Sequence, residues 1–254
     1  MNRNKAVIII VLVGIVIGIV LYFFNVQSFL FGGANNVNGN YVQLVGAFIG
    51  GCIVIYGLFI NNKRVEEQIR QNNLSEKSLI SNRFKDASTL LGSDKKTTLL
   101  AGVYSLHQIA TESNASNDKA NYVKIVHTLL VELIKDLSLT DPYDEKIMLI
   151  LLDLVFSKES IYQQFPSSLN GCRFYNIDFS NLNIDNVSFD NSTINNALFR
   201  TMNMSNVSFK NVILSNSDFS NSQLKSIDFS KSTLDTNAFN NANVKKILFC
   251  DCNH

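Results

Sequence analysis

Three residues near the end of the chain, Cys250, Cys252 and His254, are of the types that bind transition metals. Two thiolates and an imidazole hold Zn²⁺ only if their side chains converge on one point. The surrounding pattern repeats an apolar residue at every fifth position, which turns Cys252 toward the interior and Cys250 toward solvent. Because these side chains diverge, the sequence predicts no metal site here, and nothing else in it indicates a cofactor.

His107 and His127 are the other candidates for acid–base or metal chemistry, and both fall within predicted helices. Neither has a cysteine or carboxylate at a spacing that would build a site, so we expect partial burial or ordinary surface placement. The sequence also lacks the phosphate-binding loop, the zinc-protease motif and the nucleophile elbow. We therefore expect a protein without catalytic activity.

Charge is balanced along the whole chain of 254 residues, with 22 basic against 21 acidic side chains. Residues 1–60 hold 2 basic and no acidic residues, residues 61–165 hold 13 and 14, and residues 166–254 hold 7 and 7. A nucleic-acid-binding protein normally presents a basic face, so we expect no nucleic-acid partner. Four scattered cysteines are too few for a disulfide framework, which favours a reducing compartment.

Two apolar runs, residues 6–24 and 42–60, are each nineteen residues long. About 20 apolar residues cross a bilayer as a helix, and the first run is too long for a signal peptide and has no cleavage site after it. Basic residues flank the pair on its outer sides, whereas the loop between the runs is uncharged. Residues 1–60 are thus predicted to form a transmembrane hairpin with both termini in the cytoplasm. The flanking basic residues are Arg3, Lys5, Lys63 and Arg64.

Each apolar run contains two glycines four residues apart, Gly14 and Gly18 in the first and Gly46 and Gly50 in the second. This spacing lets helix backbones approach closely in lipid, which predicts packing within the hairpin or between copies. Neither run contains an ionisable side chain, so no proton relay or ion pathway is expected.

Residues 61–165 have the apolar spacing of helices and form a predicted cytosolic connector. The first helix should continue from the second membrane span and end at Gly92. Further helices are expected after Ser93 and Asp94, over about residues 119–137, and from Pro142 onward.

Residues 166–254 repeat with a period of five. From Phe174 to Phe249, sixteen of sixteen residues at this spacing are apolar, and Asn follows two positions later in ten cases. The period fits neither a helix nor a strand. It fits short straight segments joined by turns at Asn, Ser and Asp, which stack as coils about 4.8 Å apart. The repeat therefore predicts a solenoid, in which each unit needs its neighbours to bury its apolar face.

The stretch "NSDFSNSQLKSIDFS" resembles the pentapeptide-repeat family, and the resemblance covers residues 172–251. It implies a right-handed quadrilateral β-helix. Residues 83–110 are similar to a helical segment that precedes the repeats in membrane-anchored bacterial members, which implies the bacterial inner (cytoplasmic) membrane. The expected fold class is thus a mixed membrane protein with two transmembrane helices, a helical connector and a C-terminal β-helix.

Four sides per coil would stack residues that lie twenty apart in the sequence. We expect two facing phenylalanine ladders separated by aliphatic ladders, which together fill a narrow core. The phenylalanine ladders are Phe179, Phe199, Phe219 and Phe239, and Phe189, Phe209, Phe229 and Phe249. Of the two other sides, one holds Ile184, Met204, Leu224 and Val244, and the other holds Phe174, Ile194, Leu214 and Leu234.

The function expected from these features is a membrane-anchored, cytosol-facing scaffold that binds an unknown protein partner. The alternative is a self-assembling membrane effector that perturbs the bilayer in response to a cytosolic signal. The DNA mimicry known for some soluble members of the family implies a strongly acidic rod, which the balanced charge does not favour. No capping helix follows Phe249, so a homodimer through the last coil is also expected, as in some family members.

Overall fold

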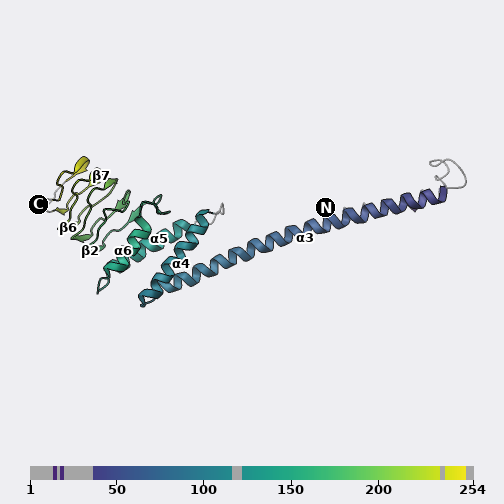
Figure 1. Ribbon diagram of the computed structural model, residues 1–254, viewed down its shortest axis with the longest axis horizontal. Helices are drawn as coiled ribbons and strands as arrows, with labels where there is room; N and C mark the ends of the chain where they lie inside the picture. Colours follow the sequence, from purple (N-terminus) through teal and green to yellow (C-terminus); the bar gives the residue numbers. More distant parts are fainter. Residues whose placement is uncertain (1–13, 16–17, 20–36, 116–121, 235–237, 250–254) are drawn as a thin grey trace. The chain divides into compact units, whose positions relative to one another are not determined.

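The structure is a computed structural model that describes residues 14–15, 18–19, 37–115, 122–234 and 238–249. Its contacts divide the chain into two compact units, Met1–Leu79 and Ile80–His254. Helix α3 (Val37–Leu91) contributes residues to both (Figure 1). The helices that come after it and the solenoid therefore belong to one unit with one hydrophobic core.

Helix α3 runs without interruption through the second predicted span and the helix expected after it. It ends at Leu91, where Gly92 N–H donates to Thr89 O at 3.3 Å. Among the described residues, only this helix is long and apolar enough to cross a membrane, over Gly46–Leu91. Most of the first predicted span, residues 6–24, lies outside the described residues. The structure therefore offers one candidate membrane helix where the sequence predicts two.

Three shorter helices come next, α4 (Lys96–Ala115), α5 (Tyr122–Ser138) and α6 (Glu145–Phe156). The last of them was expected to begin at Pro142, and this expectation was wrong by three residues. The Asp144 side chain accepts a hydrogen bond from Ile147 N–H at 3.1 Å, so Asp144 is the N-cap and the helix begins after it.

The start of the second unit depends on a close approach between α3 and α4. A Cβ on Gly102 would lie 2.8 Å from both the carbonyl oxygen of Ala87 and the Cβ of Leu90, so only glycine fits. Arg83 reinforces this contact by donating to both carboxylate oxygens of Glu112, at 2.8 and 3.2 Å. The close approach of α3 and α4 thus accounts for the glycine at position 102.

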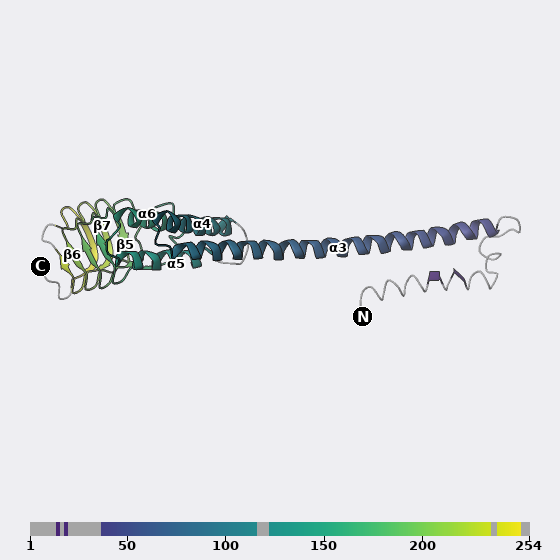
Figure 2. The ribbon, with the colours of Figure 1, turned by 90° about the horizontal axis from the view of Figure 1, so that it is seen from below.

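The C-terminal strands are parallel and pair in registers of twenty residues. One sheet has the order β2-β4-β6-β8, another β5-β7-β9, and β1 pairs with β3. Single bridges such as Asp178 to Leu198 and Ser188 to Ser208 join coils along the remaining sides. The predicted four-sided solenoid is therefore confirmed, and Figure 2 shows its coils stacked against each other. The strands are β1 (Ser167–Ser168), β2 (Arg173–Tyr175), β3 (Val187–Ser188), β4 (Thr193–Asn195), β5 (Asn203–Ser205), β6 (Ile213–Ser215), β7 (Gln223–Asp228), β8 (Thr233–Leu234) and β9 (Asn243–Leu248).

The core of the solenoid consists of two stacks of phenylalanine rings. Phe199 and Phe219 stack with centroids 4.5 Å apart and planes 2° apart, and Phe189 and Phe209 stack at 5.1 Å and 5°. Rings of different stacks meet edge to face, as Phe199 and Phe209 do at 5.8 Å. Aromatic rings prefer offset stacking and edge-to-face contacts, so this arrangement fills the narrow interior favourably.

The last coil departs from the expected core. Phe249 still stacks on Phe229 at 5.5 Å, but it is 44% exposed, and Val244 is 45% exposed. Their placement as buried ladder residues was therefore wrong, because within the described residues no further coil covers them. At the opposite end of the solenoid, the sequence analysis placed the first apolar centre at Phe174, which is one repeat too late. Leu169 lies five residues before Phe174 and is fully buried, so the repeat period itself could have identified it.

The turns of the solenoid explain the recurring asparagine. Thirteen described non-glycine residues have a positive φ, and every one lies two residues after an apolar centre. Asn tolerates this left-handed conformation better than most residues because its short side chain hydrogen-bonds locally. Its side chains also form ladders, since Asn196 donates to Asn176 Oδ1 at 2.7 Å and Asn211 donates to Asn191 Oδ1 at 2.9 Å.

Four of the thirteen described residues are not asparagine, and among them Thr201 gives a test because it is β-branched and has a φ of 55°. We expect Thr201→Asn to stabilise the protein by about 1 kcal/mol, since it relieves backbone strain. The matched control is Thr233→Asn, which changes the same residue type within strand β8 and should be neutral or destabilising. Thermal unfolding followed by circular dichroism measures both, and an unchanged melting temperature for Thr201→Asn would contradict this account.

Candidate interaction surface

The outer sides of the solenoid carry columns of polar side chains at fixed positions. One column, on the side of β5, β7 and β9, contains Asn186, Asn206, Ser226 and Lys246, all with positive φ. Asn206 Nδ2 donates to Asn186 Oδ1 at 3.2 Å, which links neighbouring coils. Because backbone and side chain are both held, the column presents amide groups in a defined geometry.

Ion pairs also join neighbouring coils on these outer sides. Arg200 Nε lies 2.5 Å from Asp218 Oδ2, and Lys210 Nζ lies 3.2 Å from Asp228 Oδ2. Partial burial alone would raise the pKa of Asp218, but hydrogen bonds from Ser220 and Arg200 outweigh it and lower that pKa. Both aspartates therefore stay ionised and paired at neutral pH.

Buried serines connect coils from inside, two residues before the apolar centres. Ser222 Oγ donates to Phe199 O at 2.5 Å and accepts from Met202 N–H at 3.1 Å. Ser192 makes the equivalent pair of bonds, to Leu169 O at 2.9 Å and from Cys172 N–H at 3.1 Å. Each hydroxyl thus pairs with one buried carbonyl oxygen and one buried N–H group of the preceding coil, and these bonds hold the two coils together.

The model of the family described as pentapeptide repeats matches residues 194–230 with eight copies of the repeat. The matched residues lie within the four-sided coils described above. This segment is a pentapeptide-repeat solenoid. The same period continues on both sides of the match, from Leu169 to Phe249. A search of the curated proteins found no match to the chain.

The helices cover the first coil of the pentapeptide-repeat solenoid. Ser138 at the end of α5 accepts from Arg173 N–H at 3.3 Å, and the Phe156 carbonyl at the end of α6 accepts from Asn183 N–H at 2.6 Å. His127 Nε2 and Ser167 Oγ form a hydrogen bond of 2.9 Å. The proximal end of the solenoid is therefore bonded to the helices.

The two histidines meet at this junction, and both contact Tyr162. His107 Nδ1 lies 3.0 Å from the Tyr162 hydroxyl, and the His127 ring lies 5.9 Å from the Tyr162 ring. Burial lowers the pKa of both imidazoles and raises the pKa of the tyrosine. The hydroxyls of Tyr162 and Ser167 hold the two rings, so the cluster is a packed interface. Tyr162 was missed because no periodicity marks it in the sequence.

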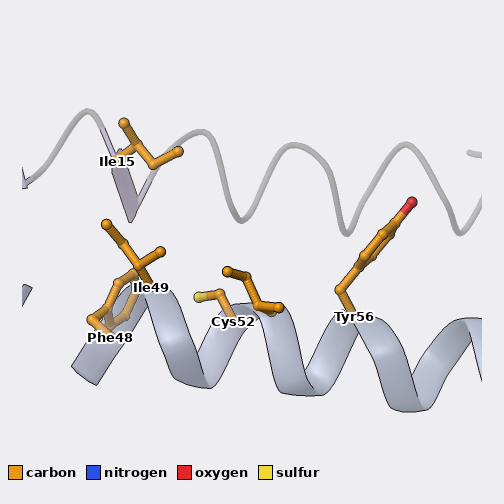
Figure 3. Close-up of a pocket in the computed structure, with 6 residues that line it drawn as sticks. Ile15, Phe48, Ile49, Cys52 and Tyr56 are labelled. Atoms are coloured by element: carbon orange, nitrogen blue, oxygen red, sulfur yellow. The ribbon is translucent and has the colours of Figure 1, made fainter. Parts of the chain in front are cut away.

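The apolar part of α3 forms a shallow hollow together with Ile15. The hollow has a volume of about 100 Å³ and is lined by α3 side chains from Phe48 to Tyr56 (Figure 3). A Cβ on Gly14 would lie 2.4 Å from the Phe48 ring, so this glycine lies directly against an aromatic side chain. A Cβ on Gly18, Gly46 or Gly50 would meet no atom within 4 Å. Of the four glycines predicted to pack helices together, Gly14 makes a close contact, and its neighbour is the ring of Phe48.

The structure contains no group of three histidine, cysteine or carboxylate side chains placed to hold a metal, as far as its described residues extend. Cys250, Cys252 and His254 lie outside those residues. The ordered polar columns on the outer sides of the solenoid are therefore the candidate functional surface.

The histidine junction makes folding sensitive to acid. Because burial lowers their pKa, His107 and His127 bind protons in the unfolded chain at higher pH than in the folded one. Stability should therefore be fully present above about pH 6.5 and decline as the pH falls below it. We expect a lower melting temperature at about pH 5.5 than at about pH 7.5, measured by circular dichroism.

The variant His107→Gln/His127→Gln keeps polar side chains at both positions without their titration. Most of the difference between the two pH values should disappear in this variant. An equal loss of stability in native protein and variant would show that other groups cause it.

Proposed function

We propose that this protein is a membrane-anchored scaffold whose pentapeptide-repeat solenoid binds a protein partner in the cytosol. The observation that carries the proposal is the fixed geometry of the outer side chains. Asn186 and Asn206 are linked between coils, and Arg200 and Lys210 are held by carboxylates of the next coil. A surface that is already ordered binds a partner with little loss of conformational entropy.

The exposed apolar side chains of α3 support the anchoring part of the proposal. Ile53, Val54, Ile55 and Leu58 are 60–66% exposed. An exposed apolar surface of this kind is unfavourable in water and is typical of contact with lipid or another protein. We propose that the bilayer surrounds this segment and that residues 6–24 form the second span of a hairpin. Both termini would then lie on the cytoplasmic side of a bacterial inner membrane.

The proposed topology is tested by labelling single cysteines in a protein whose four natural cysteines are replaced. A membrane-impermeant maleimide added to spheroplasts should label Asn35→Cys in the predicted outer loop. It should label Asn73→Cys in α3 only after the membrane is permeabilised. Labelling of Asn73→Cys in intact spheroplasts would contradict a cytosolic solenoid, and protection of Asn35→Cys would contradict the hairpin.

A partner of the solenoid should be recovered by affinity capture of the full-length protein from cross-linked membranes. The variant Asn186→Arg/Asn206→Arg/Ser226→Arg places three bulky cations in one outer column and should lose a partner that binds there by about 10-fold or more. The matched control is Asn176→Arg/Asn196→Arg/Asn216→Arg on the opposite side. All six positions have a positive φ, so both variants carry the same backbone strain.

The result separates the two candidate functions. Loss of a partner with the first variant and its retention with the control would support the scaffold. Equal recovery with both variants would contradict binding at this column. Recovery of the protein alone would favour the alternative, a self-assembling membrane effector.

The homodimer expected through the last coil stays a prediction. Leu248 and Phe249 are 54% and 44% exposed, so this end offers apolar surface for a second copy to cover. Light scattering of the full-length protein in detergent measures whether such a dimer forms.

A further inference from the structure

Strand β9 (Asn243–Leu248) forms an open edge at the distal end of the solenoid. It pairs with β7 on one side, and within the described residues no strand pairs with its other side. β7 and β9 are each six residues long, whereas the other strands of the solenoid have two or three. An edge of this length presents a row of backbone donors and acceptors that can receive another strand.

Positive charge collects beside this edge. Lys225 of β7 is in register with Lys245 of β9, and Lys246 comes directly after it. All three are exposed, and none has an ion-pair partner among the described residues. Like charges directly opposite each other on neighbouring strands are destabilising, so an added carboxylate would be favourable here.

The column that contains Lys225 and Lys245 carries a negative charge closer to the helices. Asp185 lies at the equivalent position two coils before Lys225, and its carboxylate accepts from Ser205 N–H at 2.7 Å. The sequence along this face is therefore Asp185, Ser205, Lys225 and Lys245. Basic residues appear on this face only toward the open end.

Apolar side chains complete the edge. Val244 is 45% exposed and Leu248 is 54% exposed, while Ile247 is partly buried. In the preceding coil the equivalent residues Leu224 and Ile227 are 1% exposed because β9 covers them. A strand added to β9 would bury Val244 and Ile247 in the same way.

We propose that the open edge of β9 binds an extended acidic segment of a partner protein as an added parallel strand. This inference rests on the proposed scaffold function and specifies the chemistry of its partner. The segment would place apolar residues above Val244 and Ile247 and a carboxylate above Lys245. Main-chain hydrogen bonds would supply affinity, and the lysines would select for acidic sequences.

A second copy fits this edge less well than an acidic segment. Two solenoids related by a two-fold axis would pair β9 with β9 in opposite directions. Lys245 and Lys246 of one copy would then face the same lysines of the other. The expected cost is the repulsion of like charges across paired strands.

The inference is tested by fluorescence polarisation with full-length protein in nanodiscs of zwitterionic lipid. The probe is a labelled peptide, Asn-Leu-Glu-Glu-Ile-Asn-Phe, which aligns with residues 243–249 and places its two Glu residues above Lys245 and Lys246. A second probe has Lys in place of both Glu residues. Native protein should bind the acidic probe at least about 10-fold more tightly than the basic probe. Raising the salt from about 50 mM to about 300 mM should weaken this binding several-fold.

The decisive comparison is a charge exchange. In Lys245→Glu/Lys246→Glu the preference should reverse, so that the basic probe binds more tightly. The control Lys146→Glu/Lys158→Glu makes the same charge change at exposed positions near the helices and should keep the native preference. Circular dichroism verifies that both variants are folded.

Three results would overturn the inference. The first is equal binding of the two probes to native protein, and the second is no binding of either, in which case the lysines serve to protect the edge from aggregation. The third is a stable dimer through the β9 edge, seen in light scattering of the native protein and disrupted by Val244→Glu, because such a dimer would occupy the edge. The scaffold function fails separately, because its capture experiment changes Asn186, Asn206 and Ser226, whereas the peptide experiment changes Lys245 and Lys246.

Discussion

The solenoid depends on one constraint, that each coil of twenty residues satisfies its backbone and buries its side chains only against the next coil. The bonds repeat without change of register, as when Phe199 N–H donates to Asp218 O at 2.8 Å and Phe209 N–H donates to Asp228 O at 2.7 Å. A shift by one residue would expose the apolar centres and bury polar side chains. The stacked rings, the buried serines and the asparagine ladders all require this register.

The two ends of the stack differ in how far their side chains and backbone groups are covered. The proximal coil is bonded to α5 and α6 through Arg173, Asn183 and Ser167, so its edge is covered. The distal coil leaves the side chains of Val244 and Phe249 nearly half exposed. Covering one end explains why the helices and the solenoid share a single core. Within the described residues nothing covers the distal end, so its exposed side chains are available for association.

The sequence predicts the solenoid well because the period determines it. An apolar residue at every fifth position indicates which side chains enter the core, and Asn two positions later marks a turn that needs a positive φ. The junction could not be predicted, because the contact of His107 and His127 with Tyr162 joins segments with no shared pattern. The cap at Asp144 was missed because Pro142 is an equally good signal for the start of a helix. The exposure of Val244 depends on whether another coil stacks on β9, and periodicity within one coil carries no information about that neighbour.

Some residues depart from the repeat pattern. At these positions a requirement other than stable folding decides the residue type. In the column of Asn186, Asn206 and Ser226, the last residue is Lys246, with a φ of 55°. Asn at this position would have less backbone strain. Lysine also adds a charge beside Lys245, which works against folding. Residues that reduce local consistency tend to lie at functional sites. The same reasoning explains why the core positions, where packing alone decides, follow the repeat so closely.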